Sequence, residues 1–454
     1  MNKIKLTSAH LIPLSFLVAI LIGTLLLSLP VSSVGGNWTP FTDALFTSTT
    51  SVCVTGLVVK DTYQYWSHFG QAVILILIQI GGIGVITTVS TMMMLARKRF
   101  SLSERLMLRD AMNLENLNDL LGFLYKVIRG TFAVEMVGAC FYMIAFIPRL
   151  GAAKGIWVSV FTAISAFCNA GIDVLGPDSL APYQNSPLIL TVTMALIIMG
   201  GLGYVVWQDI DSKVTFGRKR GLSPSQIFRR LSEHTKLVLT LTGSLIAAGT
   251  VFIFAAEFSN PQTLGGMSLP QKLLNSLFES VTFRTAGFAT FSQAGLTDVS
   301  CLGAYVLMFI GGSPIGTAGG VKTTTVYLAI LGVHSYIRGK NDAHVYKRSV
   351  REEAMRKATA IIEVSMVTVF GLTMLLVASN PVGIEDGLFE IVSACATVGL
   401  TRNLTPTLNT VGKLIVTVGM YLGRIGPISM AFFLTGGKKD ESGVHYAEGN
   451  FYIG

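Results

Sequence analysis

The chain has 454 residues, of which 51% are hydrophobic and only 13% are charged. Soluble folds carry about 25% charged residues, and the mean hydropathy of this chain is high at +0.60. Glycine is also abundant, with 47 residues, and membrane helices contain more glycine than soluble helices do. These values indicate a membrane protein and exclude soluble enzymes and nucleic-acid-binding proteins.

The net charge of +9 comes from 34 Lys and Arg residues that are clustered along the chain. Most of them lie at Lys3 and Lys5, in the stretches 97–126, 213–236 and 338–357, and at Lys438 and Lys439. Each cluster falls in a gap between apolar segments. Because cytoplasmic loops carry an excess of Lys and Arg, we expect these gaps and both termini to face the cytoplasm of a cell-membrane protein. Attraction to anionic membrane lipids is a secondary effect of the same charge.

Eight apolar segments approach or exceed the ~20 residues that a helix needs to cross a bilayer. They cover residues 11–29, 70–96, 127–147, 187–207, 236–256, 301–336, 359–379 and 411–435. The first is longer than the apolar region of a signal peptide, so we interpret it as a true span. The eight segments form four pairs. Within each pair, a half-apolar stretch that is too short to cross joins the two members on the outer side.

These four joining stretches align with one another. They read LFTSTTSVCVTGL (45–57), VFTAISAFCNAGI (160–172), LFESVTFRTAGF (277–288) and LFEIVSACATVGL (388–400). Each has a Phe, a run of small and hydroxyl residues, and a glycine, and these glycines lie 112 to 116 residues apart. We therefore predict four repeats of span, re-entrant loop and span. Their expected bounds are 6–96, 120–208, 236–337 and 359–435, with a cytoplasmic tail at 436–454.

Four re-entrant loops predict one pore, because non-helical backbone at membrane depth is tolerated only inside protein or along a watery path. The C-terminal end of a short helix favours a cation, and glycine lets consecutive carbonyl groups face the axis. The candidate selectivity-filter residues are Val54, Thr55, Gly56, Asn169, Ala170, Gly171, Thr285, Ala286, Gly287, Thr397, Val398 and Gly399. Close helix packing is the alternative reading of such small residues, but it does not explain four copies in register.

A second aligned series occurs in the following spans. It reads QIGGIG (79–84), IMGGLG (198–203), FIGGSP (309–314) and YLGRIG (421–426). For Gly81, Gly82, Gly200 and Gly201 we favour helix contacts or kinks over a direct role in ion binding.

The third member of this series continues into GGSPIGTAGG (311–320), which combines Pro314 with five glycines. No continuous helix contains such a stretch, so we predict a flexible constriction below the filter, with a static kink as the alternative. The candidate gate residues are Gly311, Gly312, Ser313, Pro314, Gly316, Gly319, Gly320 and Lys322.

Arg424 replaces the second glycine of the series in the fourth repeat. A buried guanidinium normally faces a cavity or a partner, so we expect Arg424 to point at the pore under the filter. There it would donate hydrogen bonds to carbonyls of the gate loop and oppose the passage of cations. Asp43 and Glu390, in the short helices, are expected to add negative charge to the outer mouth.

The order, spacing and loop motifs together resemble the Trk/Ktr/HKT superfamily of potassium uptake proteins, most closely its KtrB-type membrane subunits. The resemblance covers approximately residues 6–435. It implies an all-α polytopic membrane protein, not an enzyme, in which one chain forms one pore with fourfold pseudosymmetry. The implied ion is potassium, bound by the backbone of Val54, Thr55, Asn169, Ala170, Thr285, Ala286, Thr397 and Val398. Only the fourth loop keeps the letters TVG of channel filters, which implies a looser selectivity and some sodium transport.

The resemblance also implies partners. These are a second copy of the chain and a cytoplasmic ring of KtrA- or TrkA-type subunits that binds ATP and ADP, while this chain itself holds no cofactor. The basic loops and the tail HYAEGNFYIG offer surfaces for them. Two alternatives remain: a secondary transporter that couples potassium to sodium or protons, and a membrane-embedded enzyme. The second is less favoured, because the six histidines are dispersed along the chain.

Overall fold

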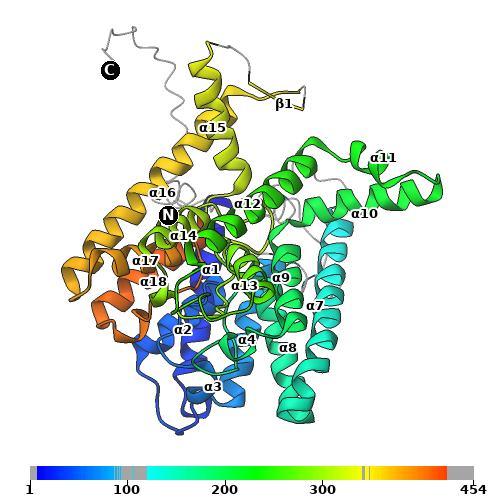
Figure 1. The fold of residues 1–454 in the computed structure, drawn as a ribbon. Helices are drawn as coiled ribbons and strands as arrows, with labels where there is room; N and C mark the ends of the chain where they lie inside the picture. Colours follow the sequence, from blue (N-terminus) through cyan, green and yellow to red (C-terminus); the bar gives the residue numbers. More distant parts are fainter. Residues whose placement is uncertain are drawn as a thin grey trace, which may run out of the picture.

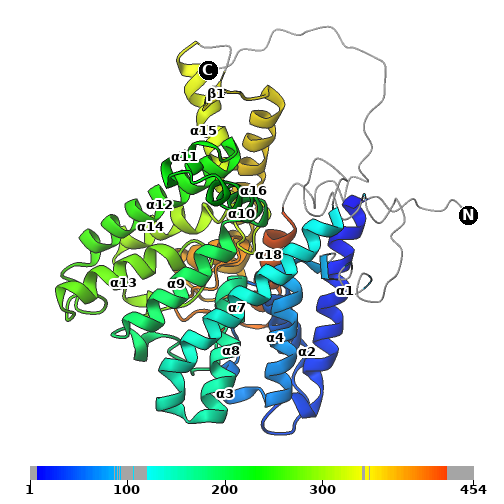
Figure 2. The same ribbon diagram turned by 90° about the vertical axis from the view of Figure 1, so that its right-hand side faces the viewer.

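The computed structural model describes residues 8–85, 120–339, 343–346 and 348–426, with single positions at 87, 88, 90, 93 and 106. The predicted tail (436–454), the end of the last predicted span and most of the basic stretch 97–126 lie outside the described residues. The described part is almost wholly helical (Figures 1 and 2). A short antiparallel ribbon of β1 (His344–Val345) and β2 (Arg348–Ser349) is its one sheet.

The α-helices follow one another in four groups. The first two groups are α1 (Ser8–Ser28), α2 (Phe41–Cys53), α3 (Thr62–Tyr65) and α4 (His68–Ile83), then α7 (Leu120–Leu150), α8 (Ala152–Cys168), α9 (Pro187–Gly201), α10 (Tyr204–Lys219) and α11 (Pro224–Arg229). The last two are α12 (Glu233–Glu257), α13 (Leu269–Thr282), α14 (Asp298–Phe309) and α15 (Thr323–Ile337), then α16 (Glu352–Ser379), α17 (Ile384–Cys395) and α18 (Thr410–Ile425). Short 3₁₀ turns lie at Pro30–Ser32, Ala181–Tyr183, Gln293–Gly295 and Thr405–Thr407.

Each group begins with a long apolar helix and continues with a short, largely buried one. Within the described residues, α1, α7, α12 and α16 are the four unbroken helices that are long and apolar enough to cross a membrane. They match the first member of each predicted pair. The short helices α2, α8, α13 and α17 fall on the four joining stretches and do not cross. In Figure 1 the last group, in orange, lies beside the blue first group, so the arrangement closes on itself.

The second member of each pair breaks at the second aligned series. Gly84, Gly203 and Gly426 follow α4, α9 and α18 with φ of 97°, 93° and 91°, a region that glycine adopts readily. In the third group α14 ends at Phe309 and α15 begins only at Thr323, which confirms the predicted interruption.

The prediction of one continuous span over 187–207 is wrong, because α10 leaves α9 at an angle of 97°. The positive φ of Gly203 turns the chain at this point. The helix that follows carries Asp209, Asp211 and Lys213, so it does not continue the apolar crossing.

Glycines near the ends of these helices pack directly on the short helices. A Cβ atom built on each would overlap a carbonyl oxygen in the last turn of the short helix of the same repeat. The pairs are Gly81 with Val52, Gly200 with Phe167, and Gly423 with Cys395. The preference for a packing role at Gly81 and Gly200 is therefore confirmed. In the third repeat, Gly311 meets Gly319 of its own loop instead.

A buried ion pair joins the last group to the first. The Nζ atom of Lys413, on α18, lies 2.7 Å from Oδ1 of Asp43, on α2, and Nζ of Lys60 lies 4.0 Å from the other carboxylate oxygen. Asp43 is only 5% exposed. The expectation that Asp43 adds free negative charge to the mouth is therefore wrong, since two lysines neutralise it.

Replacing Lys413 with Met should destabilise the protein, because removing one partner of a buried pair costs about 3 kcal/mol. We expect a lower thermal unfolding midpoint for the purified variant. The double variant Asp43→Asn/Lys413→Met should regain most of the loss.

The matched control is Arg356→Ala, which breaks an exposed pair with Glu352 on α16. Exposed pairs of this kind contribute about 0.5 kcal/mol or less. Equal decreases in the unfolding midpoint of the two single variants would show that the Lys413–Asp43 contact does not hold the first and last groups of helices together.

Candidate ion pathway

The four short helices end in the same kind of backbone turn. Two residues before each filter glycine, Val54, Asn169, Thr285 and Thr397 have φ of 57°, 59°, 68° and 50°. The glycines have φ of 103°, 62°, 85° and 95°, and the residue between does not have a positive φ. Positive φ is rare and strained for β-branched residues. Because residues with positive φ alternate with a residue without it along each loop, successive polar groups of the backbone face the same side.

The four loops meet in cyclic order around one axis. A Cβ atom on Gly56 would lie 2.5 Å from the carbonyl oxygen of Ala170, one on Gly171 2.6 Å from that of Ala286, and one on Gly287 2.5 Å from that of Val398. A Cβ atom on Gly399 would overlap the carbonyl oxygen of Thr55. Each loop therefore presses on the next, and the fourth presses on the first. The structure thus brings the four filter glycines and the residue before each of them into one ring of contacts, and the other four predicted filter residues occupy the turns that lead into it.

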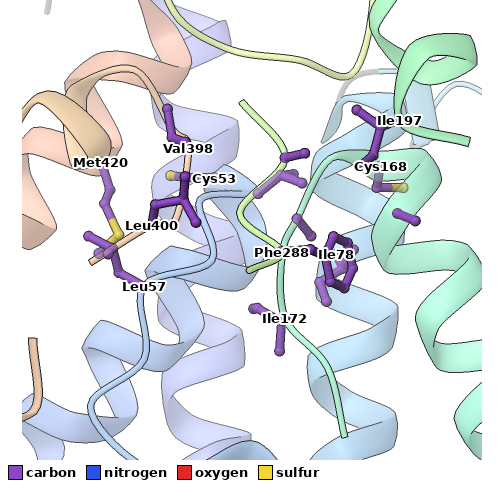
Figure 3. Packing of buried hydrophobic residues seen from close by; sticks show 14 of the residues in the cluster. Cys53, Leu57, Ile78, Cys168, Ile172, Ile197, Phe288, Val398, Leu400 and Met420 are labelled. Atoms are coloured by element: carbon purple, nitrogen blue, oxygen red, sulfur yellow. The ribbon is translucent and has the colours of Figure 1, made fainter. Parts of the chain in front are cut away.

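The side chains that follow the filter glycines point into the protein core. Leu57, Ile172, Phe288 and Leu400 are at most 2% exposed. Figure 3 shows them in one apolar cluster with Ile78 and Met420. These buried side chains thus anchor the periphery of the ring in the protein core, and the backbone faces its centre.

Hydroxyl groups in the short helices hold the turns, and the sequence analysis did not identify them. The Thr50 hydroxyl accepts a hydrogen bond from the Gly56 amide at 2.9 Å, and the Ser393 hydroxyl accepts one from the Gly399 amide at 3.0 Å. The Thr282 hydroxyl donates to the Phe288 carbonyl at 2.6 Å. The sequence does contain a pattern that indicates them, because a Ser or Thr lies four residues after the Phe of every aligned motif.

Glu390 also supports a loop and does not face the outer mouth. It is fully buried, and its carboxylate accepts hydrogen bonds from the hydroxyls of Thr401, at 2.7 Å, and Thr405. The expectation that it adds charge to the mouth is wrong, because these bonds use it to tie the outer segment of the fourth loop to α17.

A cavity of about 620 Å³ opens on the outer side of the ring, and all four filter glycines line it. Asp61, Asp173 and Asp178 also line it, and the described lining residues include no Lys or Arg. Burial raises the pKa of Asp173 to about 6, which leaves its carboxylate mostly ionised at neutral pH. The cavity therefore attracts cations. These three carboxylates were not identified from the sequence.

The loop between α14 and α15 binds the break between α9 and α10. The amide of Ser313 donates to the carbonyl of Gly201 at 3.0 Å, and the amide of Thr317 donates to that of Gly200 at 3.1 Å. In return, the Tyr204 amide donates to the Ile315 carbonyl at 2.9 Å. Pro314 and Gly316 also pack here, against Gly203 and its neighbours.

The same loop reaches the turns of the filter from below. The Thr317 hydroxyl lies 3.0 Å from the Phe167 carbonyl and 3.1 Å from Oδ1 of Asn169. The Gly319 amide donates to the Thr285 hydroxyl at 3.2 Å. Thr317 was not singled out from the sequence, because a single Thr among glycines carries no pattern.

Cationic side chains hold the loop in place. Arg424 donates to the carbonyl of Thr317 and to that of Gly81, both at 2.6 Å. Lys322 donates to the Ala318 carbonyl at 2.6 Å and contacts that of Gly319 at 3.4 Å. The predicted hydrogen bonding of Arg424 to the loop is therefore confirmed for one carbonyl, that of Thr317, while Gly81 belongs to α4. The remaining candidates, Gly311, Gly312 and Gly320, lie where the two ends of the loop pair through the bridge of Ile310 with Val321.

Comparison with known proteins supports the resemblance seen in the sequence. A family model described as TrkH, cation transport protein, matches residues 12–439. The chain is 36% identical to the potassium/sodium uptake protein NtpJ of Enterococcus hirae, over 99% of this chain and 98% of that protein. It is 35% identical to Ktr system potassium uptake protein B of Bacillus subtilis, over 99% of this chain and 98% of that protein.

The fold has a solved counterpart. The potassium transporter TrkH from Vibrio parahaemolyticus matches 96% of this chain and 86% of its own, with a TM-score of 0.72 at 14% identity. This likeness supports the fold alone. Together with the family match, it shows that the chain is a helical membrane protein that belongs to the TrkH family of cation transport proteins and is not an enzyme.

Proposed function

We propose that the chain carries potassium, and to a lesser degree sodium, into the cell through the ring of four loops. The observation that carries this proposal is the cyclic contact of the four filter glycines beneath a cavity with three carboxylates and no cationic side chain among its described lining. A backbone-lined ring can replace the hydration shell of an alkali ion. The names of NtpJ and of the B. subtilis relative support potassium and sodium as the ions.

The ion ligands in this proposal are the carbonyl groups of Val54, Thr55, Asn169, Ala170, Thr285, Ala286, Thr397 and Val398. Rubidium flux into liposomes tests the function. Flux that follows an imposed potassium gradient, with no sodium or proton gradient present, supports conduction. Flux that requires such a second gradient would instead support a coupled transporter.

In the gate of this proposal, the segment Gly311–Gly320 closes the path below the ring while Arg424 and Lys322 hold it there. The contacts of the loop with the side chains of Asn169 and Thr285, in the second and third filter turns, support this position. The two cations also oppose the entry of a permeant cation.

Gly56→Ser should lower potassium uptake by about tenfold and shift the preference toward sodium. At a φ of 103°, a side chain is strained by about 1–3 kcal/mol, and its Cβ would press on the Ala170 carbonyl. Competition between potassium and sodium for rubidium uptake measures the shift.

Gly36→Ser is the matched control for this change. Gly36 also has a positive φ, of 64°, but a Cβ there meets no atom within 4 Å. Its uptake should equal that of the parent. Unchanged potassium affinity in Gly56→Ser would remove Gly56 from the filter.

Arg424→Ala should raise rubidium flux in the absence of any activator, because it removes the link that Arg424 makes between the Thr317 carbonyl of the gate loop and the Gly81 carbonyl of α4. Arg424→Lys separates two causes. A lysine keeps the charge but lacks the planar fork that bonds two carbonyls at once. If flux rises in both variants, the two hydrogen bonds of the arginine keep the pore closed. If flux rises only in Arg424→Ala, the positive charge at this position keeps it closed. Unchanged flux in both, at normal expression, would contradict a gate.

We further propose that two copies of the chain assemble in the cell membrane, with both termini in the cytoplasm, on a ring of KtrA- or TrkA-type subunits. The relatives from B. subtilis and Vibrio alginolyticus are named as parts of a Ktr system. The described basic segments, α10, α11 and the β1–β2 ribbon, extend together from one end of the molecule (Figure 1). Such a surface suits an acidic partner.

ATP and ADP should therefore change rubidium flux only when the ring protein is present in the same liposomes. The pore chain holds no nucleotide in this proposal, so nucleotide added to it alone should leave flux unchanged. Crosslinking in native membranes should capture a dimer. A nucleotide response from the pore chain alone would contradict this assignment of regulation.

A further inference from the structure

A groove outside the filter ring runs along the molecule between α7 and α9. Its upper part, of about 750 Å³, lies where α7, α9 and α10 meet. Its lower part, of about 370 Å³, continues between α7 and α9. Val134 and Met199 line both parts, so the two form one continuous groove.

The upper part is basic. Lys126 and Arg129 of α7 and Arg218 of α10 line it, all with exposed side chains, against the single carboxylate of Asp211. Among the described residues, none of these three cations forms an ion pair. The groove head therefore carries net positive charge. Trp207 forms part of its wall, and tryptophan is the residue typical of the boundary between lipid and water.

The lower part is apolar. Its walls are aliphatic and aromatic side chains, including Val137, Phe141 and Leu188, with Thr191 as the one hydroxyl residue. From Lys126 to Phe141 the helix rises by about 22 Å. That is about half of the ~40–45 Å that a bilayer measures with its headgroup regions, so the groove matches one leaflet.

We propose that this groove binds an anionic phospholipid, with its phosphate among Lys126, Arg129 and Arg218 and an acyl chain along the α7–α9 wall. The positive charge alone would also bind free phosphate, but free phosphate has no apolar group to fill the lower part of the groove. A neutral lipid would leave the three cations unmatched. The groove head lies on the side that the basic loops predict to be cytoplasmic, where anionic lipids are concentrated.

The wall of the groove is continuous with the gate loop. The Trp207 ring packs edge-on against Phe167 at 5.6 Å and against Tyr204 at 5.9 Å. Tyr204 binds the Ile315 carbonyl through its amide. A lipid in the groove thus lies next to the bend that supports the gate loop.

Native mass spectrometry of the full chain, in an equal mixture of phosphatidylglycerol and phosphatidylcholine, tests the proposal. The parent should retain phosphatidylglycerol about tenfold over phosphatidylcholine. The variant Lys126→Gln/Arg129→Gln/Arg218→Gln should lose this preference. The control Lys219→Gln/Arg220→Gln/Arg229→Gln removes equal charge outside the groove, from the C-terminal ends of α10 and α11 and the residue after α10, and should keep the preference. Equal retention of both lipids by the parent, or equal loss in the two triple variants, overturns the proposal.

Two further arms separate a lipid from a free anion. Ala195→Trp places a large side chain in the apolar part and should reduce retention of phosphatidylglycerol with the basic head intact. Inorganic phosphate in excess should not displace the lipid. Unchanged retention in Ala195→Trp, or displacement by phosphate, would contradict a lipid groove. These measurements need no ion flux, so their failure is distinct from failure of the proposed transport function.

Discussion

The close approach of four glycines is the constraint on which the rest of the structure depends. At each of them a single Cβ atom would press on the carbonyl of the neighbouring loop, so the ring exists only while the loops have no side chain there. Holding four backbone segments this close requires rigid support from outside. The short helices, the buried residues after each glycine, and the Lys413–Asp43 pair that joins the two ends of the chain supply that support.

The gate loop follows from the way the second series of helices ends. A helix end leaves carbonyl groups without intrahelical partners. In the second repeat, the carbonyls of Gly200 and Gly201 are such groups, and they accept the amides of Thr317 and Ser313. The third repeat replaces its helix end with a loop long enough to reach them. The loop of the third group thus provides hydrogen-bond partners for the helix end of the second group and for its own backbone.

The sequence predicted the parts of the structure that repeat. The aligned loops located the turns of the candidate filter, and the alignment of Arg424 with the second glycine of the second series placed the arginine near the gate loop. Contacts between distant positions carried no such signal, because Arg424 binds carbonyls that lie 107 and 343 residues away. Hydropathy did not reveal the bend after Gly201, since it reports burial in lipid and not the direction of a helix. It also did not show that Asp43 forms ion pairs with lysines or that the carboxylate of Glu390 is bonded to two threonine hydroxyls.

The contacts of Arg424 set the scale of the free energy needed to open the proposed gate. A hydrogen bond to a charged group contributes about 1.5–3 kcal/mol, so releasing the bonds to Thr317 and Gly81 costs about 3–6 kcal/mol in all. Shifting a two-state equilibrium from 1:99 to 99:1 takes about 5.5 kcal/mol. In the proposed gate, the contribution of Arg424 alone is therefore similar in size to the free energy that converts a closed population into an open one. A partner that binds the open form of the proposed gate more tightly by this amount would offset the contribution of Arg424.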